Sequence, residues 1–248
     1  MMKQKYSSVI QDSRFRGGAS LVSLMNNHEA ILPEFASKTA LKSSRKRNKP
    51  LSVKRLLRKE WDYIIMNDQT QAPARSLTQK NTIKILKKKY LRRIQDYSPS
   101  STVILLMTAA YKSSKVNYSS DLGGFKKFTK KLLEGYESYA SVFPNAKIAP
   151  LGLGYKYIKD NYEKQVWEQL YASDGYHPSP HGTYLEACIV YCSIVGEEPP
   201  KYDEEWWDTA QYKIRKKDRP TKQEAAILHE AACQVCGIAQ EYEFMFEL

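Results

Sequence analysis

Three short apolar runs, each followed by a polar loop and a helical pattern, constrain the fold of this chain more than any other feature. The runs occupy residues 61–66, 101–108 and 146–150, and the second is rich in β-branched side chains. Strands that alternate with helices across short loops form parallel sheets covered on both faces. The sequence therefore predicts an α/β fold built on a parallel sheet.

The remaining elements follow the same alternation. A further short strand is predicted at 6–10, and residues 109–123 are expected to form a polar loop that walls a site. Apolar residues at helical spacing predict helices at 21–35, 78–97, 125–142 and 151–171. The sequence contains no internal repeats.

A polar turn, Asp174-Gly-Tyr-His177, leads directly into another helical pattern. Gly175 favours the turn and Pro178 favours an extended conformation for His177, so the Asp174 and His177 side chains can point the same way. The carboxylate can then accept the proton of one ring nitrogen and leave the other as a general base toward a hydroxyl nucleophile. The structural alternative is that Asp174 caps a turn and His177 is an ordinary, partly buried histidine.

The helix after this turn has recognisable ends. Ser179 is a suitable N-cap, Pro180 is a favourable first residue, and Gly196 supplies a C-terminal stop. One face of the helix is apolar and is expected in the core; it carries Leu185, Cys188, Ile189, Cys192 and Val195.

The run Asp-Gly-Tyr-His-Pro-Ser at 174–179, followed by Gly-x-Tyr-Leu-x-Ala, resembles the last conserved block of the SGNH (GDSL-type) ester hydrolases. The resemblance extends from about Gly17 to Gly196, in three blocks in the correct order. It implies a three-layer, flavodoxin-like sandwich and acyl transfer to a serine, with His177 as base and Asp174 as its orienter. It implies no metal and no cofactor.

The other two blocks of the resemblance imply an oxyanion hole. Gly17-Gly18-Ala-Ser20 stands at a helix start and is similar to the block whose glycine N–H stabilises the oxyanion, with Gly18 as the best match. Asn67 follows the 61–66 run, where the family carries an asparagine that donates its amide; Ile65 replaces the usual glycine. The structural alternatives are a tight turn at Gly18 and a capped loop at Asn67.

The family pattern opens with a strand and Gly-Asp-Ser or Gly-Asn-Ser, and no such block precedes Gly17. The nearest match is Val9-Ile-Gln-Asp-Ser13, which makes Ser13 a candidate nucleophile. Ser13 stands too close to Gly18 for the helix and strand that separate these blocks in the family, and it can equally end the second strand of the fold. We therefore expect that the first strand and its serine are missing from this sequence by truncation, or that the catalytic block is lost.

Two functions follow from this pattern. The first is a serine ester hydrolase acting on a small ester or an acetylated carbohydrate, and the aromatic content of 12% favours the carbohydrate. The second is a pseudoenzyme that keeps the fold and binds without cleaving.

The formal net charge of +12 raises the question of an anionic partner. Much of the excess lies in residues 38–59 and 80–93, which are expected to be solvated faces, although 44–50 is also similar to a nuclear-import signal or a phosphate-binding patch. No aromatic residues interleave with the charges of that patch, so a nucleic-acid partner is not expected. No apolar run is long enough to span a membrane, and the first eight residues lack a secretion signal. As written the chain is expected in the cytoplasm, or outside the cell if an N-terminal segment is missing.

The cysteines fall in two pairs, 188/192 and 233/236, both within expected helices. They are predicted to be small core residues. Cys233-Gln-Val-Cys236 also has the spacing of a zinc knuckle or a redox motif, but zinc would need a second ligand pair, so no metal is expected.

The chain is expected to form one domain over residues 1–200, with a basic insert at 38–59, and a C-terminal extension over 201–248. Residues 197–220 predict an irregular excursion, and Thr221 with Glu224 predicts a capping box at the start of a terminal helix. Ala226, Leu228 and Ala231 are expected to pack that helix on the domain.

Overall fold

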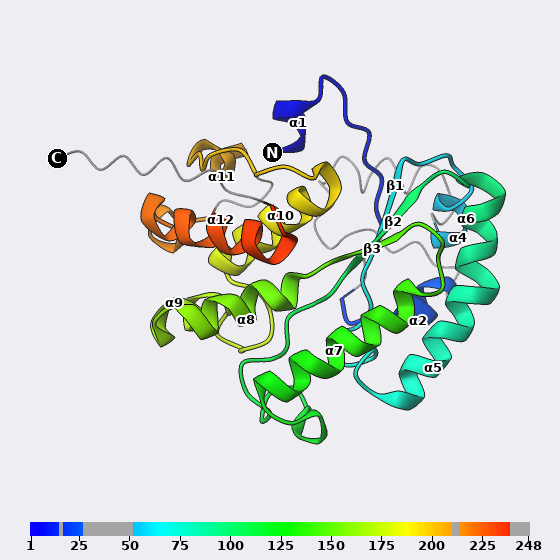
Figure 1. The fold of residues 1–248 in the computed structure, drawn as a ribbon, viewed down its shortest axis with the longest axis horizontal. Helices are drawn as coiled ribbons and strands as arrows, with labels where there is room; N and C mark the ends of the chain where they lie inside the picture. The colour runs from blue at the N-terminus through cyan, green and yellow to red at the C-terminus, as the bar shows by residue number, and fades with distance from the viewer. Residues whose placement is uncertain (15–16, 27–51, 210–213, 239–248) are drawn as a thin grey trace, which may run out of the picture.

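The computed structural model describes residues 1–14, 17–26, 52–209 and 214–238, and it has an α/β fold (Figure 1). Its sheet contains three parallel strands in the order β1-β2-β3: β1 (Tyr63–Met66), β2 (Thr102–Leu106) and β3 (Ala146–Ala149). Tyr63 lies opposite Thr102, and Val103 lies opposite Ala146. The predicted parallel sheet is confirmed.

Helices and short helical turns connect and cover these strands. Before the sheet come α1 (Met2–Lys5), α2 (Leu21–Asn26) and α4 (Val53–Leu56). Between strands come α5 (Ser76–Ile85), η1 (Leu86–Leu91), α6 (Arg92–Tyr97), η2 (Ser120–Leu122) and α7 (Phe125–Ala140). After the sheet come α8 (Leu151–Asn161), α9 (Lys164–Gln169), α10 (Pro180–Val195), α11 (Glu205–Thr209), η3 (Lys216–Asp218) and α12 (Lys222–Cys236).

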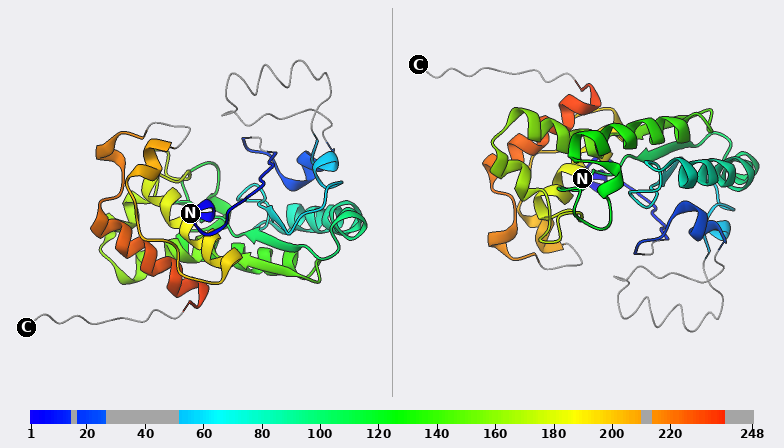
Figure 2. Two further views of the ribbon diagram at one scale, coloured as in Figure 1. Left: turned by 90° about the horizontal axis from the view of Figure 1, so that it is seen from above. Right: turned by 90° about the horizontal axis from the view of Figure 1, so that it is seen from below.

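The helices flank the sheet on both sides. Figures 1 and 2 show α5, α6 and α7 on one side, and α8, α10 and α12 on the other. Helices α7 and α10 both contact β2 and β3. The crossovers from β1 to β2 and from β2 to β3 each contain a helix, as parallel neighbours require.

Strand β2 lies in the centre of the described sheet. Val103, Ile104 and Leu105 are all buried, which fits a parallel strand covered on both faces. Strand β1 instead alternates: Ile64 and Met66 are buried, whereas Tyr63 and Ile65 are 42% and 46% exposed. One face of β1 is therefore less covered than the other.

The predicted basic helix at 78–97 forms, but its middle is a π-helix, η1. Leu86, Tyr90 and Ile94 are buried at four-residue spacing along it. The hydrogen bonds of a π turn run to the fifth residue rather than the fourth, and all three side chains reach the core. The Tyr90 hydroxyl donates to the Leu21 carbonyl at 2.8 Å and joins this helix to α2.

The ends of α10 and α12 agree with the prediction. Ser179 Oγ accepts from Gly182 N at 3.2 Å, and Gly196 ends α10 with a φ of 76°. Thr221 and Glu224 form the capping box at the start of α12. Helix α12 packs on α10 and α8.

Three predictions about elements were wrong. Residues 6–10 form no strand: the segment holds two serines, and Ile10 is 86% exposed, so it has no apolar face to bury against the sheet. The helix predicted at 151–171 breaks after Asn161, because Tyr162 adopts an extended backbone and its hydroxyl donates to Glu230 at 2.9 Å. Ala226 is exposed; the neighbouring Ala225 is buried instead.

Several expectations lie partly outside the described residues. The helix predicted at 21–35 is described only to Asn26, and most of the 38–59 insert is outside, apart from the part that contains α4. The division near residue 200 stays a prediction, although Leu228 and Ala231 of α12 belong to the same apolar core as the sheet.

The cysteines lie where α10 meets α12. Cys188, Cys192 and Cys233 are buried, and Cys236 is half-buried, so they are core residues as predicted. Within the described residues, no group of three or more metal-ligating side chains is arranged to hold an ion. None of the described helices is both long and apolar enough to cross a bilayer.

Candidate active site

Asp174 and His177 form the compact turn that the sequence predicts. Asp174 Oδ1 accepts from the backbone N–H of Tyr176 and of His177, each at 3.0 Å. Asp174 Oδ2 lies 2.7 Å from His177 Nδ1. Because a carboxylate only accepts, Nδ1 is the donor in this contact, and Nε2 is left for another partner.

The electrostatics of this pair keep the carboxyl ionised. Partial desolvation of Asp174 acts to raise its pKa, but the two backbone N–H donors and the His177 ring outweigh it and lower the pKa below its usual value. A negative Asp174 orients the imidazole and stabilises its protonated form. The His177 side chain is 65% exposed, so its free nitrogen is open to solvent and to ligands.

Backbone bonds anchor the turn to its surroundings. The His177 carbonyl accepts from Ala172 N at 2.9 Å, and Ser179 N donates to the Leu170 carbonyl at 2.9 Å. The Gly175 carbonyl accepts from Lys112 N at 2.9 Å, which ties the turn to the loop after β2. Gly175 has a φ of 74°, in the left-handed region that favours glycine.

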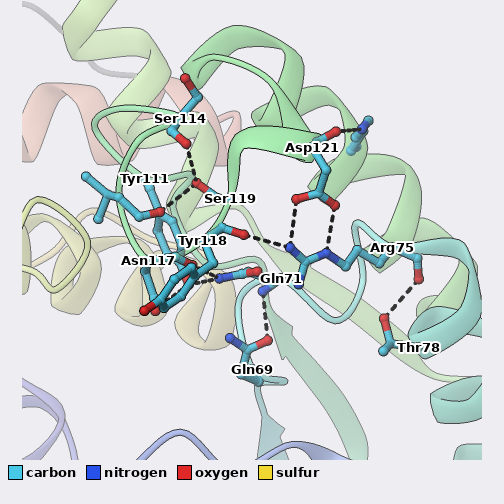
Figure 3. A network of polar contacts seen from close by, with 12 residues as sticks. Gln69, Gln71, Arg75, Thr78, Tyr111, Ser114, Asn117, Tyr118, Ser119 and Asp121 are labelled. Carbon is cyan, nitrogen blue, oxygen red and sulfur yellow. Dashed lines mark hydrogen bonds and ion pairs between the residues drawn. The ribbon is translucent and has the colours of Figure 1, made fainter.

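Aromatic rings extend this connection toward the loop after β1. The ring centroid of Tyr176 lies 4.2 Å from that of His177 and 5.5 Å from that of Tyr111. The Tyr111 hydroxyl accepts from Gln71 Nε2 at 3.3 Å and from Asn117 Nδ2 at 3.2 Å. The loops that follow β1 and β2 therefore meet at Tyr111, as Figure 3 shows.

The same two loops are joined again at their outer edge (Figure 3). Arg75 forms a two-point ion pair with Asp121, at 2.8 and 2.9 Å, and also donates to the Tyr118 carbonyl. Asn117 and Tyr118 have φ values of 48° and 55°, which is unusual for residues other than glycine. The Arg75 and Gln71 contacts hold this conformation, and the Tyr118 side chain is 92% exposed at the rim.

Asp68 joins the Gly17–Ser20 loop to the end of β1. This carboxylate is almost fully buried; Oδ1 accepts from Leu21 N and Gln69 N, each at 2.9 Å. Oδ2 accepts from the hydroxyls of Thr82, at 3.0 Å, and Tyr139, at 2.9 Å. Desolvation raises the pKa of Asp68 despite these donors. The carboxylate also caps the first turn of α2.

Gly18 and Asn67 stand close in sequence to the two residues of the contact between Asp68 and Leu21 N. Asn67 immediately precedes Asp68, and Gly18 lies three residues before Leu21, with a φ of 67°. Both residues are exposed. In the described part of the chain, no hydrogen bond joins either of them to His177, so their pairing in one oxyanion hole stays a prediction.

Within the described residues, the contacts around Ser13 join it to the segment before β1 and not to the His177 turn. Its backbone N–H donates to Asp12, whose carboxylate forms an ion pair with Lys59 at 2.9 Å. Lys59 stands before β1, whereas the His177 turn contacts the loop after β2. Among the described residues no hydrogen bond connects Ser13 with His177, and the role of Ser13 as nucleophile stays a prediction.

Comparisons with known proteins address the fold. No family model matches this chain, and no curated protein matches it. A DUF4886 family protein from Bacteroides uniformis superposes with a TM-score of 0.57 at 15% identity, covering 77% of this chain and 70% of that one. A chain from Slackia heliotrinireducens gives a TM-score of 0.46 at 20% identity; the match covers 72% of this chain and 81% of that one. Its own assignment as an SGNH hydrolase is provisional. At these identities the first likeness shows a shared fold, and the second carries no argument.

Sequence reasoning missed the residues that hold the loops together. Asp68, Gln71 and Tyr111 all follow strands, which is a weak signal that a polar residue stands at the sheet edge where ligands bind. Their partners are distant in sequence: Asp68 meets Tyr139, and Gln71 meets Asn117. Only the fold brings them into contact.

Proposed function

We propose that this protein is an ester hydrolase of the SGNH type, with His177 as general base and Asp174 as its orienter. The observation that carries the proposal is the 2.7 Å contact between Asp174 and His177 Nδ1, which leaves Nε2 open at an exposed rim. The carboxyl end of a parallel sheet is also where such folds place their ligands.

The proposed reaction is acyl transfer. His177 Nε2 takes the proton of a serine hydroxyl while the oxygen bonds to the ester carbonyl carbon. The carbonyl oxygen becomes negative and is stabilised by the Gly18 N–H and the Asn67 amide. Collapse breaks the ester bond, and the imidazolium returns its proton to the departing alcohol. Water then releases the acyl group by the same steps, and small esters or acetylated carbohydrates are the proposed substrates.

A pseudoenzyme that binds without cleaving is the second candidate. It is favoured by the surroundings of His177, because no described side-chain hydroxyl is hydrogen-bonded to its ring. It is also favoured by the ion pair between Asp12 and Lys59, which ties the neighbour of Ser13 to the segment before β1.

Labelling with a fluorophosphonate, followed by mapping of the modified residue, separates the two candidates. A hydrolase labels on one serine, and His177→Ala abolishes the labelling. Loss of the label in Ser13→Ala would assign the nucleophile to Ser13. A folded protein that takes up no label would rule out the serine hydrolase and favour the pseudoenzyme.

A further inference from the structure

A strongly basic hollow lies outside the candidate active site. It has a volume of about 400 Å³ and opens between α4 and the continuous helix that runs through η1 into α6. Six lysine and arginine side chains line it, together with Asp96 and Tyr97. We call this feature the basic hollow.

The helical geometry explains why the cations gather there. Lys88, Arg92 and Asp96 follow each other at four-residue spacing along η1 and α6. They are two positions out of step with the buried row of this helix, so they lie on its opposite side and are exposed. Stretches of π-helix often occur at functional sites, and here the π turns carry Lys88 and Lys89 into the lining.

The cations of the basic hollow have few anionic partners. Among the described residues, Lys54, Arg58, Lys88 and Arg92 form no ion pair with a carboxylate. Lys89 donates instead to the neutral Asn26 side chain, at 2.7 Å. Elsewhere on the described surface, cations such as Arg75 and Arg215 are paired with aspartates. Six cations gathered around one carboxylate, Asp96, repel each other, and a bound anion offsets that repulsion.

We propose that the basic hollow binds a compact ligand that carries at least two phosphate groups. Arg58 and Arg92 supply guanidinium groups, which suit two-point contacts with phosphate oxygens. The volume of about 400 Å³ suits a small polyanion that enters from the solvent side. Tyr97 is the one aromatic side chain in the lining, so the hollow lacks the stacking platform of a single-strand groove. A soluble phosphoester and a phosphorylated lipid headgroup share this chemistry.

Calorimetric titration of the full chain with inorganic tripolyphosphate at low salt tests the proposal. Binding is expected, and the variant Lys88→Ala/Arg92→Ala is expected to weaken it about tenfold or more, because charge-assisted contacts are lost. The matched control, Lys126→Ala/Lys130→Ala, removes two exposed charges at the same spacing on α7 and is expected to change the affinity less than about twofold. Circular dichroism confirms that each variant is folded.

Sedimentation with phosphatidylcholine vesicles, with and without a phosphatidylinositol bisphosphate, distinguishes a soluble phosphoester from a lipid headgroup. Retention on the phosphorylated vesicles that is lost in Lys88→Ala/Arg92→Ala assigns a lipid headgroup; tripolyphosphate binding without retention assigns a soluble ligand. Three results would overturn the proposal: neither probe binds, the α7 control loses as much affinity as the hollow variant, or duplex DNA binds while tripolyphosphate does not.

Discussion

Glu186 is a partly buried carboxyl on α10, and its Oε1 accepts from the Tyr155 hydroxyl at 3.0 Å. Desolvation raises its pKa from 4.5 to about 7, and the Tyr155 hydrogen bond opposes this only in part. The folded state therefore prefers the protonated acid. The contribution of Glu186 to the free energy of unfolding is complete below pH 4.5 and is lost as the pH rises through about 7.

Glu186→Gln should remove this pH dependence, because glutamine still accepts from Tyr155 and never ionises. We expect the variant to match the wild type near pH 4 and to exceed it at pH 8 by up to about 3 kcal/mol, at about 1.4 kcal/mol for each unit of pKa. Urea unfolding at both pH values measures this difference. Equal stability of wild type and variant at pH 8 would contradict the buried-acid interpretation; Glu137→Gln, on the exposed side of α7, is the control.

Asp68 is the residue on which two loops of the candidate site depend. Asp68→Ala would leave the buried hydroxyls of Thr82 and Tyr139 and the first N–H of α2 without their acceptor. We expect a loss of roughly 3 kcal/mol or more in the free energy of unfolding. Asp121→Ala breaks the exposed pair with Arg75 and should cost much less, because solvent screens that pair. A comparable cost for the two variants would show that Asp68 does not hold the loops.

At the scale of elements, Gly182 sets how closely α10 approaches the chain before the His177 turn. A Cβ at this position would lie 2.3 Å from both the Leu170 carbonyl oxygen and the Tyr155 hydroxyl. The Leu170 oxygen cannot easily move, because it accepts from Ser179 N. Gly182→Ala should therefore cost about 2 kcal/mol or more in thermal or urea unfolding.

The control for this substitution is Gly124→Ala, at the start of α7. A Cβ there meets nothing within 4 Å, so the change should cost less than about 1 kcal/mol. If both variants were equally stable, the tight approach at Gly182 would have no energetic consequence.

The elements that could be predicted are those with local signals. Ser179, Pro180 and Gly196 mark both ends of α10, and β2 is a continuous apolar run; all of these agree with the structure. The errors arise at elements whose form depends on contacts between residues that are distant in the sequence. Tyr162 leaves the helix where its hydroxyl bonds to Glu230, and the middle of the helix predicted at 78–97 is the π-helix η1. Neither effect is visible in a local window of sequence.

At the scale of the whole molecule, the parallel sheet brings loops from distant parts of the chain to one edge. The sequence predicted the Asp174 and His177 contact, because both partners lie in one turn. It did not predict the bonds of Asp68 or Gln71, because these join residues about 40 to 70 positions apart. The contacts that support the candidate site are therefore visible only in the structure.

Hydrolysis of p-nitrophenyl acetate by the purified chain tests the central claim most directly. The wild type is expected to turn over at least about a hundredfold faster than His177→Ala, since a positioned general base contributes on this scale. His181→Ala is the control, because it removes a second imidazole that faces Glu224 rather than the site, and it should retain the wild-type rate. Equal rates for the wild type and His177→Ala, with both proteins folded, would contradict the assignment of His177 as a catalytic base.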